Sequence, residues 1–208
     1  MKRELKTLQS REKILHAAIE EFGRNGYDNA SLNAALAQSG ISKGLVYHYF
    51  KNKDELYLSC VKSCFDALME CLKTDCTKSS QPNLGLEAYL DARQRFFKEN
   101  PLFIRIFFNA VIQPPSHLKT DIEVLKKDFD QFNLKIFESA LSGLTLRRGI
   151  SMEDATSYFT AVQELFHQQC FKDFTDCDNG NNFIMIHEEK VRTSLDMILY
   201  GIAEEDKL

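Results

Sequence analysis

Apolar side chains recur at every third or fourth position along most of this 208-residue chain, which is the spacing of one face of an α-helix. The first such run begins at Ser10 and ends around Gly23 to Gly26, and its apolar positions are Ile14, Leu15, Ala18, Ile19 and Phe22. No segment keeps the alternation of apolar and polar positions that marks a β-strand. The predicted fold class is therefore all-α.

Turn and cap signals divide the chain into nine predicted helices. A short second helix is expected after its N-cap Ser31, and a short third helix after Ser42. The run "NKDEL" is a capping box, in which Asn52 caps the next helix and Glu55 reaches back. That helix is expected over residues 53–75, and a polar linker, "TKSSQPNLG", follows it. Further helices are predicted near residues 84–98, 101–112, 117–146, 152–175 and 183–203.

The third helix, in "SGISKGLVYHYF", has two distinct faces when each residue is advanced by about 100°. Val46, Tyr49 and Phe50 fall in one wedge and are predicted to be buried. The residues expected to face outward are Lys43, Gly44, Leu45, Tyr47 and His48. Two short helices joined by the tight turn "QSGIS" are typical of a helix-turn-helix, whose second helix fits the major groove of DNA. A helical corner without a DNA-binding role has the same periodicity, so the pattern alone leaves both interpretations open.

Positive charge is concentrated at the start of the chain. Residues 1–53 carry nine Lys and Arg against five Asp and Glu, a net charge of +4, whereas the remaining residues carry 17 against 25, a net charge of −8. Such an asymmetry is expected if only the first part of the chain binds a polyanion. An excess of this size also arises by chance, so it supports nucleic-acid binding only together with the helix-turn-helix pattern.

The stretches "ILHAAIEEFGRNGYDNAS" and "SGISKGLVYHYFKNKDEL", within residues 10–56, resemble the DNA-binding domain of the TetR family of bacterial transcriptional regulators. The resemblance implies a three-helix helix-turn-helix DNA-binding domain over residues 1–53. It also implies a larger helical effector-binding and dimerisation domain over residues 54–208, with helix 53–75 connecting the two. The residues that the resemblance assigns to double-stranded DNA are Ser31, Asn33, Ser42, Lys43, Gly44, Leu45, Tyr47, His48 and Lys53.

The chain departs from the family pattern at two places. Family members often have Thr or a small residue where this chain has Leu45, which suggests an altered base preference. The usual Ile-Ala pair of the second helix is Ala35-Leu36 here, a swap that conserves volume and that a core tolerates.

The resemblance further implies a homodimer that uses the last two helices. Apolar stripes on both helices support this expectation, although packing within one chain explains the same stripes. The residues predicted at the dimer interface are Tyr158, Val162, Leu165, Phe166, Val191, Leu195, Ile198 and Ile202.

A small-molecule effector is the third implied partner. Polar positions among aromatic ones suit a ligand pocket, but a polar row on a helix is also what a solvent-facing side produces. The predicted ligand-binding residues are Arg105, Asn109, Gln113, Gln163 and His167.

No catalytic motif, metal site or cofactor site is predicted. Cys60, Cys64 and Cys71 share one face of helix 53–75, where they form part of the core, a thiol sensor or a metal site. His16 and His187 are expected on the surface. The run "DCDNGNN" lacks the glutamate of a calcium loop and is expected to be a turn.

No apolar run approaches the roughly 18 residues of a bilayer span, and the N-terminus lacks the apolar core of a signal peptide, so a cytoplasmic location without membrane contact is expected. The leading hypothesis is a homodimeric repressor that binds a partly palindromic operator and is released by a small-molecule effector. The alternative is a DNA-bound adaptor of the same fold whose C-terminal domain recruits a protein partner. An enzyme is the third class, and no constellation of residues supports it.

Overall fold

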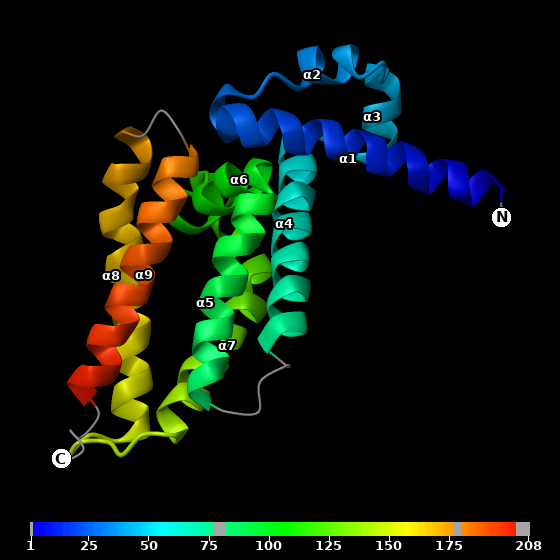
Figure 1. Cartoon of the computed structure of the whole chain (residues 1–208). Helices are drawn as coiled ribbons and strands as arrows, with labels where there is room; N and C mark the ends of the chain where they lie inside the picture. Colours follow the sequence, from blue (N-terminus) through cyan, green and yellow to red (C-terminus); the bar gives the residue numbers. More distant parts are fainter. Residues whose placement is uncertain (1, 77–81, 177–179, 203–208) are drawn as a thin grey trace. The chain divides into compact units, whose positions relative to one another are not determined.

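Helices make up nearly all of the chain, as the sequence predicts. The computed structural model describes residues 2–76, 82–176 and 180–202 (Figure 1). Within these residues the fold is all-α, with nine α-helices and one short 3-10 helix, η1 (Ser116–Leu118). The α-helices are α1 (Lys2–Asn29), α2 (Leu32–Gln38), α3 (Lys43–Tyr49), α4 (Lys53–Cys76), α5 (Pro82–Glu99), α6 (Pro101–Ile112), α7 (Lys119–Ser142), α8 (Met152–Asp176) and α9 (Gly180–Ile202).

The first helix is longer than predicted at both ends. It begins at Lys2 rather than at Ser10, because "KRELKTLQ" contains good helix formers and no helix breaker. It is also assigned through to Asn29, although Gly26 within it has a non-helical backbone with φ of 73°. A positive φ is accessible to glycine without strain, so Gly26 turns the chain out of the helix toward α2.

The helix predicted over residues 117–146 is interrupted and shorter in the structure. It begins as η1, after Pro115, and continues as α7, which ends at Ser142. Gly143 follows directly, and glycine is the preferred residue just past a helix end. The prediction of helix beyond Gly143 is therefore wrong, because the chain turns there.

The helices group into two compact units. Unit 1 comprises Met1–Asp66 and Asn100–Leu125, and unit 2 comprises Ala67–Glu99 and Lys126–Leu208. The division between these units falls inside α4, and α6 and η1 belong to the unit of the helix-turn-helix because α6 packs along α1. The assignment of DNA binding to the first predicted domain, and of effector binding and dimerisation to the second, stays a prediction.

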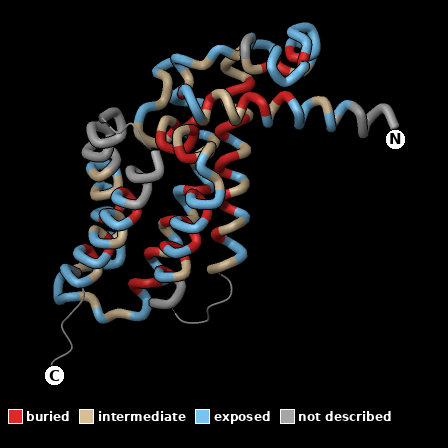
Figure 2. The backbone as a smooth tube through the Cα atoms, turned by 45° about the horizontal axis from the view of Figure 1, so that its top comes forward, coloured by how far each residue is buried: buried red, intermediate tan, exposed pale blue. Residues whose placement is uncertain are grey.

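In unit 1, α1 lies very close to α6 because Gly23 has no side chain. A β-carbon at Gly23 would lie 2.5 Å from the backbone oxygen of Leu102 on α6. On α4, the ring of Tyr57 lies 5.0 Å from Phe22 and 4.9 Å from Tyr27. Buried positions follow α1 and α4, while most of α2 and α3 is exposed (Figure 2). The well-packed α1 therefore supports two short helices that could not persist alone.

In unit 2, the core joins α5, α7, α8 and α9. Phe137 of α7 stacks on Phe159 of α8 with ring centroids 4.1 Å apart. The Tyr89 hydroxyl on α5 donates a 2.7 Å hydrogen bond to the Asn133 side chain on α7. None of the described helices offers the length and hydropathy that a bilayer-spanning segment needs.

His187 is buried in the core of unit 2, so the prediction of a surface position is wrong. Its side chain is 1% exposed, and its Nδ1 lies 3.1 Å from Glu188 Oε1. The imidazole also packs edge-on against Phe166 of α8 at 5.1 Å. The same prediction for His16 is confirmed, since that side chain is 74% exposed.

Candidate nucleic-acid interface

Helix α3 has the two faces that its sequence predicts. The Ser42 hydroxyl caps it by accepting a hydrogen bond from the Leu45 amide, and Val46 and Phe50 anchor it in the core of unit 1. Tyr49, predicted to be buried, is only half-buried. The five residues expected to face outward are all exposed, namely Lys43, Gly44, Leu45, Tyr47 and His48. The turn before α3 depends on Gly40, whose φ of 67° favours glycine.

The start of α2 differs in one detail from the sequence prediction. Ser31 occupies the N-cap position, but its hydroxyl makes no capping hydrogen bond. Its backbone amide instead donates a 2.6 Å hydrogen bond to Glu21 on α1. Both Ser31 and Asn33 are exposed, as DNA contacts would need to be.

The first turn of α4 is fixed by the predicted capping box. The Asn52 side chain accepts a 2.8 Å bond from the Glu55 amide, and Glu55 reaches back to the amide of Lys51, one residue beyond the usual partner. Lys53 in this turn is only half-exposed. Its ammonium donates a 3.2 Å bond to the carbonyl oxygen of Ala30 and lies 4.7 Å from the Tyr27 ring.

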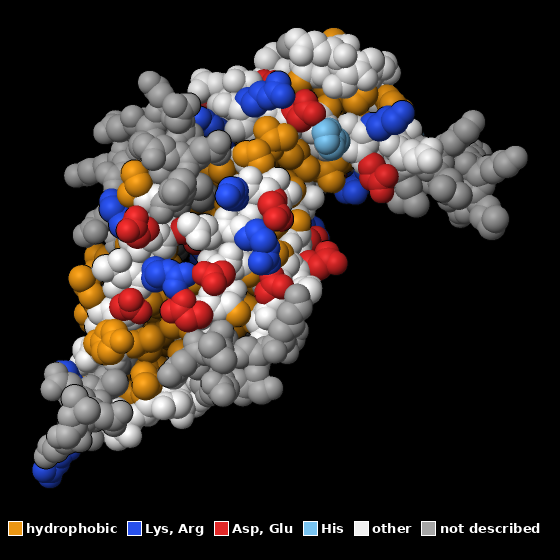
Figure 3. Space-filling view, viewed as in Figure 1, with side chains coloured by type: hydrophobic (Ala, Val, Ile, Leu, Met, Phe, Trp, Pro, Cys, Tyr) orange, Lys and Arg blue, Asp and Glu red, His pale blue; other side chains and the backbone are white. Residues whose placement is uncertain are grey.

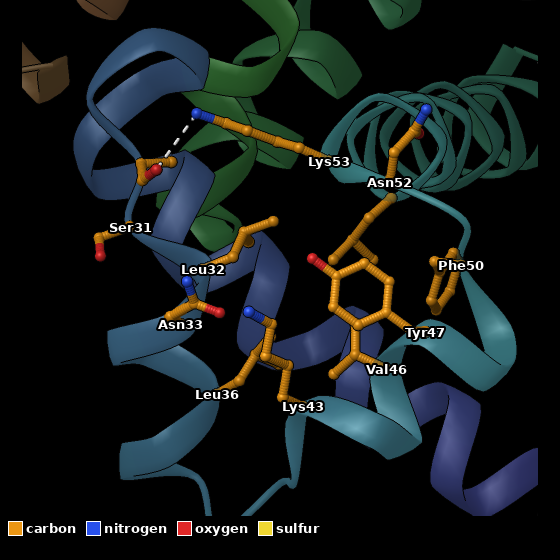
Figure 4. Close-up of a pocket in the computed structure, with 12 residues that line it drawn as sticks. Ser31, Leu32, Asn33, Leu36, Lys43, Val46, Tyr47, Phe50, Asn52 and Lys53 are labelled. Atoms are coloured by element: carbon orange, nitrogen blue, oxygen red, sulfur yellow. Dashed lines mark hydrogen bonds between the residues drawn. The ribbon is translucent and has the colours of Figure 1, made fainter.

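A hollow of about 350 Å³ opens between α2, α3 and the start of α4 (Figure 4). Its lining contains two lysines and no carboxylate: Ala30, Ser31, Leu32, Asn33, Leu36, Lys43, Val46, Tyr47, Phe50, Asn52, Lys53 and Leu56. In Figure 4 the Lys43 amino group points toward Asn33, and the Tyr47 hydroxyl points across the hollow toward the start of α2. Two ammonium groups with nearby amide and hydroxyl donors suit a phosphate.

Comparison with known proteins agrees with this geometry. A family model described as bacterial regulatory proteins of the tetR family matches residues 14–60, which contain α2, α3 and the start of α4. This match and the curated relatives place the DNA-binding part of the chain in the TetR family. The relatives are transcriptional regulators, and members of this family bind DNA, usually as dimers.

Three relatives illustrate how far the likeness extends. The uncharacterised HTH-type transcriptional regulator YxaF of Bacillus subtilis is 24% identical over 81% of this chain and 87% of its own length. The negative transcriptional regulator IcaR of the Staphylococcus aureus biofilm operon icaADBC is 33% identical, but over 42% of this chain and half of its own length. The Bacillus subtilis regulator FadR, solved with stearoyl-CoA, has a TM-score of 0.67 at 17% identity and covers 92% of this chain and 98% of its own. At that identity, FadR shows a shared fold.

The predicted ligand residues are divided between the two units. On α6, Asn109 Nδ2 would lie 3.1 Å, and Arg105 Cδ 3.8 Å, from a β-carbon at Gly26, so both side chains lie against the end of α1 within unit 1. Gln113 is exposed at the end of α6, and Gln163 is half-buried on α8 in unit 2. The side chain of His167 lies outside the described residues.

The predicted dimer residues divide by exposure. Leu195 and Ile198 on α9 are buried within unit 2, so packing inside the chain accounts for them. Val162, Phe166 and Val191 are half-buried, Tyr158 and Leu165 are exposed, and the side chain of Ile202 lies outside the described residues.

The cysteines of α4 fit the core interpretation best. Cys60 and Cys64 are fully buried, and burial raises the pKa of both thiols, which disfavours the reactive thiolate. Cys71 is half-buried, with its sulfur 3.9 Å from the carbonyl oxygen of Ala92. The described residues hold no group of three His, Cys, Asp or Glu side chains arranged for a metal ion.

Three polar residues beside the hollow were missed by the sequence analysis. Tyr27 at the end of α1 donates a hydrogen bond to Asp54 in the first turn of α4. His117 of η1 lies 3.2 Å from the Tyr27 hydroxyl and 3.4 Å from the Asp54 carboxylate. We call these three residues the Tyr27 cluster. No local sequence pattern predicts the Tyr27 cluster, because His117 is 90 positions away from Tyr27 along the chain.

Proposed function

We propose that this protein is a homodimeric repressor that binds a partly palindromic operator and is released by a small amphipathic effector. The observation that carries the proposal is the exposed face of α3, which presents Lys43, Tyr47 and His48 around Gly44. Gly44 has nothing within 4 Å of where a β-carbon would be, so α3 can approach a surface closely there. A helix with this face is suited to the major groove.

The hollow beside α3 supplies the second part of the proposed interface. Lys43 and Lys53 bring two positive charges to it, and Ser31 and Asn33 add exposed polar groups at the start of α2. Phosphate contacts of this kind fix the register of a protein on DNA, while base contacts specify the sequence. We therefore propose that the hollow contacts the DNA backbone and that the outward face of α3 contacts the base edges.

Exposed apolar side chains on α8 and α9 support the proposed dimer. Tyr158 and Leu165 on α8 are 56% and 57% exposed, and Met197 and Tyr200 on α9 are 70% and 77% exposed. Hydrophobic side chains reach the surface over these helices in Figure 3. Each pair is spaced by seven or three residues, so each lies on one face of its helix. Aromatic and methionine side chains are the ones that dimer interfaces favour.

The effector is proposed from the shared fold and from the predicted helical body. The FadR structure contains stearoyl-CoA, a ligand with a long apolar chain and a polar head. This makes stearoyl-CoA a reasonable first probe for the present chain. The expected result is weaker DNA binding in its presence, because a ligand that binds one state better shifts the population toward that state.

Selection from a random-sequence duplex pool tests the proposal directly. The protein should enrich two inverted half-sites, and native mass spectrometry should find two chains on the enriched duplex. Affinity should fall roughly 10³-fold or more between 50 and 200 mM salt, as several released counterions require. Tyr200→Glu should disrupt the dimer, while Val124→Glu, at a similarly exposed position, should leave it intact. Equal affinity for all sequences, together with a stable protein partner, would instead support the adaptor alternative.

Leu45 allows a sharper test of how α3 faces the bases. Its side chain is 37% exposed, and a leucine can cover a thymine methyl group but cannot hydrogen-bond to a base edge. If a T lies beneath it, Leu45→Ala should cost about 1 kcal/mol of binding on the selected site. The same substitution should cost almost nothing once that T is replaced by C. Additive losses across this two-by-two cycle would mean that Leu45 does not read the base.

A further inference from the structure

The Tyr27 cluster joins three segments of unit 1 that are distant in sequence. Tyr27 ends α1, Asp54 begins α4, and His117 lies in η1, which follows α6. The Tyr27 hydroxyl donates to Asp54 Oδ1, and His117 Nε2 lies within 3.4 Å of both partners. The DNA-binding role proposed above assigns no function to these three residues.

We propose that His117 is a positioning residue for DNA binding, and that its protonation strengthens the hold of the Tyr27 cluster on the first turn of α4. Affinity for DNA then rises as the pH falls. This inference rests on the proposed function, because it concerns the regulation of the same DNA-binding surface.

A short chain of contacts connects His117 to the hollow. The Tyr27 ring contacts both His117, with ring centroids 5.7 Å apart, and the Lys53 ammonium, which lies 4.7 Å from the ring centroid. Lys53 in turn donates to the carbonyl oxygen of Ala30, and both residues line the hollow. A change in the position of Tyr27 or Asp54 therefore moves the charge that we assign to a DNA phosphate.

The charges around His117 determine the sign of the effect. Asp54 faces it from α4 and Tyr27 from α1, with Asp28 and Lys53 next along those helices and Lys119 two residues further on its own segment. The nearest charge is the Asp54 carboxylate at 3.4 Å, so an imidazolium at His117 is attracted to it. A neutral imidazole lacks this charge–charge attraction, whichever of its nitrogens carries the proton, so the cluster is held less strongly.

The exposure of the cluster makes it suitable for regulation. The side chain of His117 is 54% exposed and that of Asp54 is 34% exposed, so protons can reach both groups from solvent. The hydrogen bond from Tyr27, followed by the contact with His117, holds the pKa of Asp54 below its ordinary value, so the carboxylate stays charged while histidine titrates. Histidine is the side chain that changes charge between about pH 5 and 8.

The test measures the pH dependence of DNA binding in variants, with the duplex that the wild-type protein selects as the probe. His48 is a second histidine on the surface that we assign to DNA, so all variants carry His48→Gln as the background. In that background, affinity should increase about two- to five-fold from pH 8 to pH 6, the range expected of a partly exposed ion pair. Adding His117→Gln should abolish the increase. Adding His16→Gln instead, at an exposed histidine paired with Glu20, should leave it unchanged.

Hydrogen exchange gives a second readout that needs no DNA. At pH 6, His117→Gln should speed amide exchange in the first turn of α4, and at pH 8 it should change the rate little. Parallel pH profiles with and without His117, or a loss of affinity that is equal at both pH values, would overturn the inference and leave the proposed function standing. If the wild-type protein selects no duplex, the proposed function fails and takes this inference with it.

Discussion

Each of the two units places a carboxylate and a histidine in contact, but the pair in unit 1 is partly exposed and the pair in unit 2 is buried. In unit 1, the Tyr27 cluster is partly exposed to water. In unit 2, the Arg93 cluster, made of Arg93, His187 and Glu188, is almost fully buried, with exposed fractions of 2–5%. Exposed ion pairs contribute little to stability, whereas buried ones are costly to break. Protonation can therefore change the Tyr27 cluster, whereas the Arg93 cluster holds α5 and α9 together.

The pKa shifts in unit 2 agree with a fixed cluster. Burial alone raises the pKa of Glu188, but the charge and hydrogen bonds of Arg93 reverse this and lower the pKa to about 2. Burial lowers the pKa of His187, so the imidazole stays neutral in the folded state. Both groups bind protons more readily when unfolded, so unit 2 loses stability as the pH falls below the ordinary values of 6.5 and 4.5. Acid therefore weakens unit 2, while the proposed role of His117 strengthens the Tyr27 cluster.

Breaking the Arg93 cluster should have the largest effect. Arg93 and Glu188 form two parallel 2.8 Å hydrogen bonds between α5 and α9. Glu188→Gln removes the carboxylate charge and leaves the guanidinium buried without it, so we expect a loss of about 3–5 kcal/mol in the free energy of unfolding. Urea denaturation followed by circular dichroism measures this loss.

A matched control uses the same two helices. Arg192 of α9 pairs with Glu87 and Asp91 of α5, but these side chains are 35–66% exposed. Arg192→Gln should therefore cost at most about 1 kcal/mol. The double variant Arg93→Met, Glu188→Leu should recover most of the loss of Glu188→Gln, since an apolar pair carries no desolvation penalty. Similar losses in the free energy of unfolding for Glu188→Gln and Arg192→Gln would contradict the distinction between buried and exposed ion pairs.

The second prediction concerns the contact of α1 with α6 in unit 1. Gly23→Ala places a β-carbon 2.5 Å from the backbone oxygen of Leu102, which cannot move away as a side chain could. We expect a loss of about 1–3 kcal/mol, the range for overpacking in a core. Gly44→Ala is the control, because nothing lies within 4 Å of its β-carbon. It should keep the stability and lower only DNA affinity. A stable Gly23→Ala would show that α1 and α6 can separate at little cost.

The features that the sequence could predict are those that depend on residues close together along the chain. The outward face of α3 and the caps at Ser42 and Asn52 were predicted correctly, because helical periodicity and capping depend on residues a few positions apart. The pairing of Arg93 with Glu188 spans 95 positions, and no local pattern reveals it. His187 was misplaced for the same reason, since its neighbours on other helices decide its burial.

The candidate interface shows the same limit. The outward residues of α3 can be predicted from the periodicity of one helix. The hollow is formed by α2, α3 and the start of α4 together, so no single helix predicts it. For Lys53, the sequence predicts only a phosphate contact. The structure adds its bond to the Ala30 carbonyl oxygen and its place over Tyr27. These contacts link the first turn of α4 to the end of α1 and to the segment before α2. Helical periodicity does not predict contacts between different elements.

The smallest predicted effect compares two buried tyrosines, one from each unit. The Tyr57 hydroxyl in unit 1 has no hydrogen-bond partner among the described residues, whereas the Tyr89 hydroxyl in unit 2 donates to Asn133. An unsatisfied buried hydroxyl costs free energy, so Tyr57→Phe should stabilise the protein by up to about 1 kcal/mol. Tyr89→Phe should destabilise it by about 1 kcal/mol, because buried Asn133 loses this donor. Thermal unfolding of the two variants measures the opposite signs. A loss of stability at Tyr57 would reveal a hydrogen bond that only the hydroxyl can make.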